Sequence, residues 1–147
     1  MKTANDIVNK DIITVSKNET FEDVIRIMKE KNIGEVPVLK DGKIIGVVTR
    51  DDILARTGEA PIPPVIAFWD ILITLPHNKE FVDKLSKLAG YRVEEIMSKD
   101  FLSCKLEENI ETIVTKMLDT KSNFVIINNH ENFYGIITKA DLINKAF

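Results

Sequence analysis

The first fifth of the chain shows two successive patterns of hydrophobic and polar positions. Residues 12–15 are all β-branched, which is typical of a short strand. From residue 21 to residue 28 the apolar positions recur at a spacing of three to four, which indicates a helix with one buried face. Thr20 precedes this helix as a candidate N-cap, Asp23 stands at its third position, and Gly34 marks the region where the helix has ended.

A hairpin and a second helix follow. Val36–Lys40 and Ile44–Val48 read as strands, and the Asp41-Gly42 dipeptide between them is a strong signal for a two-residue turn. Thr49 then opens a helix that runs from Arg50 to about Thr57. The predicted unit is β-α-β-β-α with a sheet of about three strands, which buries too little surface to be stable alone.

The same plan returns in the second part of the chain. A shift of 89 positions aligns residues 4–57 with residues 93–146 without a gap, and about ten pairs are identical, among them Gly46 with Gly135. The predicted elements of the second copy are a strand at 102–104, a helix at 110–120, hairpin strands at 124–127 and 133–137, and a final helix at 139–146. We therefore expect an α+β fold in which two repeats, residues 1–57 and 92–147, pack sheet to sheet.

Residues 58–91 belong to neither copy. Prolines interrupt the chain at 61, 63, 64 and 76, and two apolar stretches lie among them, so we predict a helical hairpin. Trp69 and its apolar neighbours have two interpretations. They dock onto the surface of their own chain, or they form a subunit contact or cover a ligand cleft, since so many large apolar side chains would otherwise be exposed.

Composition narrows the function classes. A net charge of -3 gives no basic excess for nucleic acid or an anionic membrane. The longest apolar run is too short for a membrane helix and the first residues have no apolar signal region, so we expect a cytoplasmic protein.

Cys104 is expected to be a buried hydrophobe. His77 and His130 have no partners at metal-ligand spacing, and no catalytic motif is present, so an enzyme is not expected.

Each predicted unit ends with Thr-x-x-Asp, at Thr49 and Asp52 and again at Thr138 and Asp141. At a strand-to-helix junction this pattern is a capping box, which needs no ligand. The alternative is a ligand site, because a helix start attracts phosphate and a carboxylate one turn on accepts hydrogen bonds from both hydroxyls of a ribose. The recurrence of the pair in both copies favours the ligand, as does the small glycine three residues before each Thr, which would let a backbone or a ring approach.

These repeated phrases resemble the cystathionine-β-synthase (CBS) domain pair, or Bateman module. The resemblance rests on the Gly-x-x-Thr-x-x-Asp endings, on the openings at 6–11 and 95–100, and on Gly34-Glu35-Val36-Pro37-Val38 before the first hairpin. It covers both repeats but not 58–91. It implies a pseudo-twofold arrangement with two clefts, each able to take an adenosine-containing ligand such as AMP, ADP, ATP or S-adenosylmethionine, and it implies a homodimer.

Carried over by position, the resemblance also names site residues. Asp52 and Asp141 would hold ribose hydroxyls, and Thr49 and Thr138 would contact ribose or phosphate. In the second copy Phe124 replaces the residue after Gly34, where it would either stack on a base or block the cleft. Basic residues just inside the helices and the walls of the adenine site complete the set: Arg50, Lys139, Ile13, Val15, Val36, Pro37, Leu102 and Val125.

Two hypotheses follow. The first is a stand-alone regulatory module that binds an adenine nucleotide or related compound as a regulatory ligand, with no required cofactor and no metal, and signals to another protein. The second is a structural adaptor whose clefts are vestigial.

Overall fold

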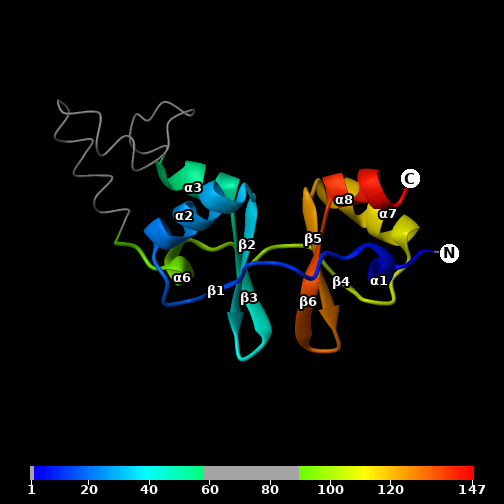
Figure 1. Cartoon of the computed structure of the whole chain (residues 1–147), viewed down its shortest axis with the longest axis horizontal. Helices are drawn as coiled ribbons and strands as arrows, with labels where there is room; N and C mark the ends of the chain where they lie inside the picture. The colour runs from blue at the N-terminus through cyan, green and yellow to red at the C-terminus, as the bar shows by residue number, and fades with distance from the viewer. Residues whose placement is uncertain (1, 58–89) are drawn as a thin grey trace.

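The computed structural model describes residues 2–57 and 90–147, which form two similar halves side by side (Figure 1). The insert predicted at residues 58–91 lies outside the described residues apart from its last two. Its helical hairpin, and the choice between the two interpretations of Trp69, therefore stay predictions. None of the described helices is both long enough and apolar enough to cross a membrane.

The long helix of the first half forms where the apolar spacing predicts it. Helix α2 spans Phe21–Lys31, and Thr20 caps it by accepting a hydrogen bond from the backbone N–H of Asp23. The helix ends at Asn32, which adopts a left-handed conformation with φ of 51°. Phe21 and Val24 are fully buried on its inner face. The predicted cap and the predicted helix are thus confirmed.

The sheet of the first half has three strands in the order β1-β2-β3. Strand β1 (Val15–Ser16) runs parallel to β2 (Glu35–Lys40), which pairs antiparallel with β3 (Lys43–Thr49). The turn between β2 and β3 consists of Asp41 and Gly42, both with positive φ (54° and 78°), as the dipeptide predicts. Helix α3 (Arg50–Thr57) follows. Only β1 differs, since it begins later than the predicted strand at 12–15.

The second half repeats this arrangement, with sheet order β4-β5-β6. Strand β4 (Ser103–Lys105) is parallel to β5 (Phe124–Asn129), and β6 (Asn132–Thr138) closes the hairpin. Helix α7 spans Ile110–Thr120 and helix α8 spans Lys139–Lys145. Cys104 is a buried free thiol, as expected, and burial raises its pKa.

Two short helices missed by the sequence analysis connect the halves. Helix α1 (Ala4–Ile7) packs in the core of the second half, and helix α6 (Val93–Ile96) packs in the core of the first. In Figure 1 the chain crosses between the halves after each of these helices, on its way to β1 and to β4. Each half is therefore completed by a helix from the other copy of the repeat.

The crossing segments also extend the sheets. Asn9 pairs with Ile136 on β6, and Ser98 pairs with Val47 on β3, each through two backbone hydrogen bonds. A side chain at Gly135 would collide with the backbone oxygen of Asn9, and one at Gly46 would collide with Met97. These glycines therefore admit a backbone segment from the other copy, which is one of the two approaches that their size predicted.

A third apolar cluster joins the two sheets. Val47, Ile126 and Ile136 are buried at its centre, and aromatic side chains such as Phe101 and Phe124 pack around them. The predicted packing of sheet against sheet is confirmed. The pocket described next opens beside this cluster.

Candidate functional site

A pocket of about 730 Å³ lies between the two halves. The first half contributes residues 11–13, residues 31–35 and Arg50. The second half contributes Asn123, Ile136 and residues 138–141, and the exchanged segment contributes Asn9. The site thus combines the Thr-x-x-Asp motif of the second repeat with two parts of the first repeat: the segment that leads into β1 and the residues before the hairpin.

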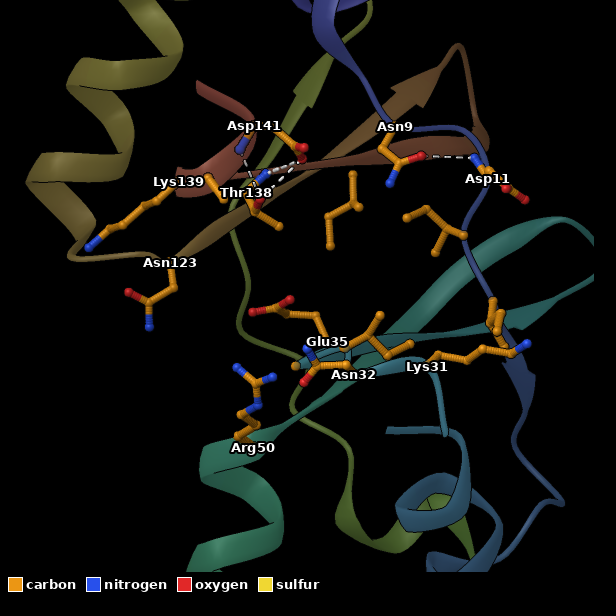
Figure 2. A pocket seen from close by; sticks show the side chains of 16 residues that line it. Asn9, Asp11, Lys31, Asn32, Glu35, Arg50, Asn123, Thr138, Lys139 and Asp141 are labelled. Atoms are coloured by element: carbon orange, nitrogen blue, oxygen red, sulfur yellow. Dashed lines mark hydrogen bonds between the residues drawn. The ribbon is translucent and has the colours of Figure 1, made fainter. Parts of the chain in front are cut away.

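The motif of the second repeat lines this pocket (Figure 2). The backbone N–H and the hydroxyl of Thr138 donate to the same carboxylate oxygen of Asp141, Oδ2, at 2.9 and 3.1 Å. The N–H of Asp141 donates in return to the Thr138 hydroxyl oxygen at 3.2 Å. The other oxygen, Oδ1, lies 3.6 Å from Nζ of Lys145, in an ion pair where the Lys145 side chain is 45% exposed. Asp141 therefore caps α8 with one oxygen and presents the other next to a solvated lysine.

The same capping geometry occurs elsewhere in the described part of the chain. Thr20 and Asp23 form it at the start of α2, and Thr3 and Asp6 form a capping box at the start of α1. The structural interpretation of Thr-x-x-Asp is thus correct for the motif as such. What distinguishes Thr138 and Asp141 is their place on a pocket between the halves.

The motif of the first repeat does not line this pocket. Thr49 and Asp52 form the same cap on α3, with distances of 2.8 to 3.1 Å. Oδ1 of Asp52 also accepts a hydrogen bond of 2.6 Å from the hydroxyl of Ser98, which lies on the segment that leads from α6 toward β4. By the shift of 89 positions Ser98 corresponds to Asn9, whose side chain instead accepts a hydrogen bond from the N–H of Asp11. The two copies therefore differ in what occupies the second carboxylate oxygen.

Charged side chains gather at one end of the pocket. Glu35 opens β2, and Figure 2 shows its side chain lying between Arg50 and the Thr138–Asp141 pair. Burial raises the pKa of Glu35, and the neighbouring carboxylate of Asp141 raises it further, while the charge of Arg50 lowers it. Lys139 also lines the pocket, but its side chain and that of Arg50 are exposed.

Apolar side chains form another part of the wall. Ile12, Ile13 and Ile33 line the pocket from the first half, and Ile136 lines it from the second. An apolar surface next to a carboxylate and a hydroxyl suits a ligand that has both a flat apolar part and hydroxyl groups. Within residues 2–57 and 90–147, no three His, Cys, Asp or Glu side chains gather into a group able to hold a metal ion.

Five of the predicted site residues line this pocket: Arg50, Lys139, Thr138, Asp141 and Ile13. Val15, Val36 and Val125 have buried side chains in the cores of the two halves. Pro37 is buried on β2, and Leu102 is half-buried against the core of the second half. The lining of this pocket includes neither these five residues nor Thr49 and Asp52.

Several lining residues were missed by the sequence analysis, among them Asn9, Asn32 and Glu35. Asn9 reaches the pocket only because α1 is exchanged between the halves, which no local pattern reveals. Glu35 stands within the Gly34-Glu35-Val36-Pro37-Val38 phrase that carries the family resemblance, but its carboxylate was not assigned to the site. Asn123, at the position that corresponds to Gly34, lines the pocket from the second half.

Comparison with known proteins agrees with this architecture. The family described as CBS domain matches residues 4–58 and 93–147. Uncharacterized protein MJ1426 of Methanocaldococcus jannaschii is 27% identical over 147 residues, covering 94% of this chain and 87% of that protein. The chain spans only 45% of a second relative from the same organism, MJ1225, at 22% identity.

Two solved structures have the same fold. CBSX2 in complex with AMP superposes with a TM-score of 0.74 at 22% identity, covering 99% of this chain and 96% of that one. The CBS domain pair of protein MJ0100, in complex with 5-methylthioadenosine and S-adenosyl-L-methionine, has a TM-score of 0.70 at 19% identity, covering 97% of each chain. At these identities the likeness shows the fold.

Proposed function

The chain belongs to the CBS domain family, as a tandem pair, and from that premise we propose that it is a regulatory module that binds an adenosine-containing ligand between its two repeats. One observation carries the proposal. Thr138 and Asp141 lie on a pocket between the halves that also has an apolar wall, whereas the same Thr-Asp caps at α1 and α2 stand outside that pocket. The two complexes with AMP and with S-adenosyl-L-methionine support the choice of ligand class.

The geometry suggests how such a ligand sits. The ribose hydroxyls bind Oδ1 of Asp141, since Oδ2 is engaged by Thr138. The base packs against the apolar wall that includes Ile12 and Ile13. The substituent at the 5′ carbon then reaches the end of the pocket where Arg50 lies.

Asp52 is proposed as the ribose acceptor of a second site. The Ser98 hydroxyl already donates to the oxygen that a ribose would use. A ligand there must share that oxygen with Ser98 or displace it, so we expect weaker binding than at Asp141. Ligand binding at either place changes contacts between the two repeats, and this is the route by which occupancy is passed on to a partner protein.

Isothermal titration calorimetry with AMP, ADP, ATP and S-adenosylmethionine tests the proposal. We expect at least one of them to bind wild type, and Asp141→Ala to weaken that binding about tenfold or more, because it removes a charge-assisted pair of hydrogen bonds. Asp23→Ala is the matched control, because it removes an equivalent cap outside the pocket. Both variants should lose about 1 kcal/mol of stability. Equal effects of the two variants on binding would leave only the capping role.

A structural adaptor is the second candidate, and one observation favours it. Leu118 on α7 and Ile143 on α8 are 69% and 65% exposed, and these helices lie on the same side of their sheet (Figure 1). Exposed leucine and isoleucine on neighbouring helices suit a contact with a second copy. We propose a homodimer through this face, in the cytoplasm, with no catalytic activity of its own. Nucleotide binding separates the two candidates, because only the regulatory module requires it.

A further inference from the structure

The pocket carries equal numbers of acidic and basic side chains. They come from each element around it: Asp11 before β1, Lys31 on α2, Glu35 on β2, Arg50 on α3, and Lys139 and Asp141 on α8. Three carboxylates and three cations cancel in formal charge. A site built for a phosphate-rich ligand would have a surplus of positive charge, which attracts and holds the anion. This pocket does not have one.

Glu35 accounts for that balance at the end of the pocket where the 5′ substituent would lie. Its side chain is half-buried, and Figure 2 shows it between Arg50 and the Thr138–Asp141 pair. Its pKa is raised by burial and by Asp141, which means that the ionised form is held at a cost that Arg50 only partly offsets. The corresponding residue of the second copy is Phe124, so the fold itself does not require an acid at this point of the strand.

We propose that Glu35 selects the ligand of this pocket by charge, favouring an adenosine compound with a cationic substituent, such as a sulfonium, over one with a phosphate. The inference rests on the proposed function and names the ligand class within it. A sulfonium near the 5′ carbon compensates Glu35 and Asp141 together. A phosphate brings further negative charge beside these two carboxylates, and the cations that would balance it, Arg50 and Lys139, are exposed and already solvated.

Two pairs of probes isolate the charge. S-adenosylmethionine and S-adenosylhomocysteine differ by one methyl group and the sulfonium charge, and AMP differs from adenosine by the phosphate. Calorimetry should show that wild type prefers S-adenosylmethionine to S-adenosylhomocysteine by about tenfold, the size expected for a unit charge near a partly solvated carboxylate. Glu35→Gln should lose most of that preference and should bind AMP more tightly, relative to adenosine, than wild type does. The control Glu30→Gln removes an exposed glutamate of α2 that does not line the pocket and should behave as wild type.

A second measurement uses wild type alone, in case the variant folds poorly. The affinity ratio of S-adenosylmethionine to S-adenosylhomocysteine should fall as the pH is lowered through the raised pKa of Glu35, because protonation removes the carboxylate charge. A ratio near one at neutral pH overturns the inference, as does an unchanged ratio in Glu35→Gln or a wild type that binds AMP more tightly than S-adenosylmethionine. If no adenosine compound binds at all, the proposed function itself is overturned.

Discussion

At Gly135 the backbones of the two repeats come close together, and Gly135→Ala tests the exchange of segments between them. The added methyl group would meet the backbone oxygen of Asn9 and the side chain of Val8, neither of which is the free end of a flexible chain. Forcing a methyl group into such a contact costs about 1–3 kcal/mol. Separating the segments also weakens the two backbone hydrogen bonds between Asn9 and Ile136, of 3.0 and 3.1 Å, each worth about 1 kcal/mol.

The expected loss is therefore about 2–4 kcal/mol in the free energy of unfolding, measured by urea titration. Gly42→Ala is the control. A methyl group there meets only Asn132, at 3.6 Å, so there is no steric clash, but the alanine must adopt the φ of 78° that Gly42 has. That strain costs about 1 kcal/mol. Asn9 and Ile136 line the pocket, so Gly135→Ala should also weaken ligand binding, whereas Gly42→Ala should not. If Gly135→Ala is no more destabilising than Gly42→Ala, the close approach of the crossing segment is not a feature of the protein in solution.

Three further predictions concern pH and assembly. The pKa of Asp23 is lowered, mainly by the hydrogen bond from the backbone of Thr20. The Asp23 carboxylate therefore stabilises the fold at a pH above its unfolded-state pKa, and this contribution is lost as the pH falls through its lower folded-state pKa. Asp23→Asn should make the difference in melting temperature between neutral and strongly acidic buffer smaller than in wild type. The pKa of Glu35 is raised, so its ionised form disfavours folding at neutral pH; Glu35→Gln should melt higher than wild type there, and this gain should vanish as the pH falls toward 4.5. Leu118→Ser should convert a dimer to a monomer in light scattering, and an unchanged mass would exclude this face as the contact.

The elements that local pattern specifies were predicted well. Apolar spacing and a Thr–Asp cap define α2, and Asp41-Gly42 defines the first hairpin, because both depend on residues close in sequence. The strand predicted at 12–15 formed only at its end. Ile12 packs beside the cluster between the sheets and, with Ile13, lines the pocket, so a β-branched run here serves the contact between the repeats.

The exchange of α1 and α6 was not predicted, and it decides which residues meet at the pocket. A four-residue helix such as Ala4–Ile7 is too short for a periodic signal, and its packing against the second half is a contact across more than a hundred positions. The pocket joins Thr138 and Asp141 of the second repeat to Ile13 and Glu35 of the first, a combination that the sequence analysis did not specify. The residue types of the motif were sufficient to predict its chemistry. The residues that lie opposite it in the pocket depend on tertiary structure, which the sequence patterns do not specify.

In the proposed function, Asp141 binds the hydroxyls of a ribose as well as capping α8. This binding is tested by a double-mutant cycle in which the ligand that binds wild type most tightly and its 2′-deoxy analogue are titrated into wild type and into Asp141→Ala. We expect removal of the hydroxyl to cost about tenfold in wild type and nearly nothing in Asp141→Ala, because both changes remove the same hydrogen bond and alanine offers no other acceptor. Equal losses in both proteins would mean that the carboxylate does not touch the sugar, and the proposed site would be contradicted.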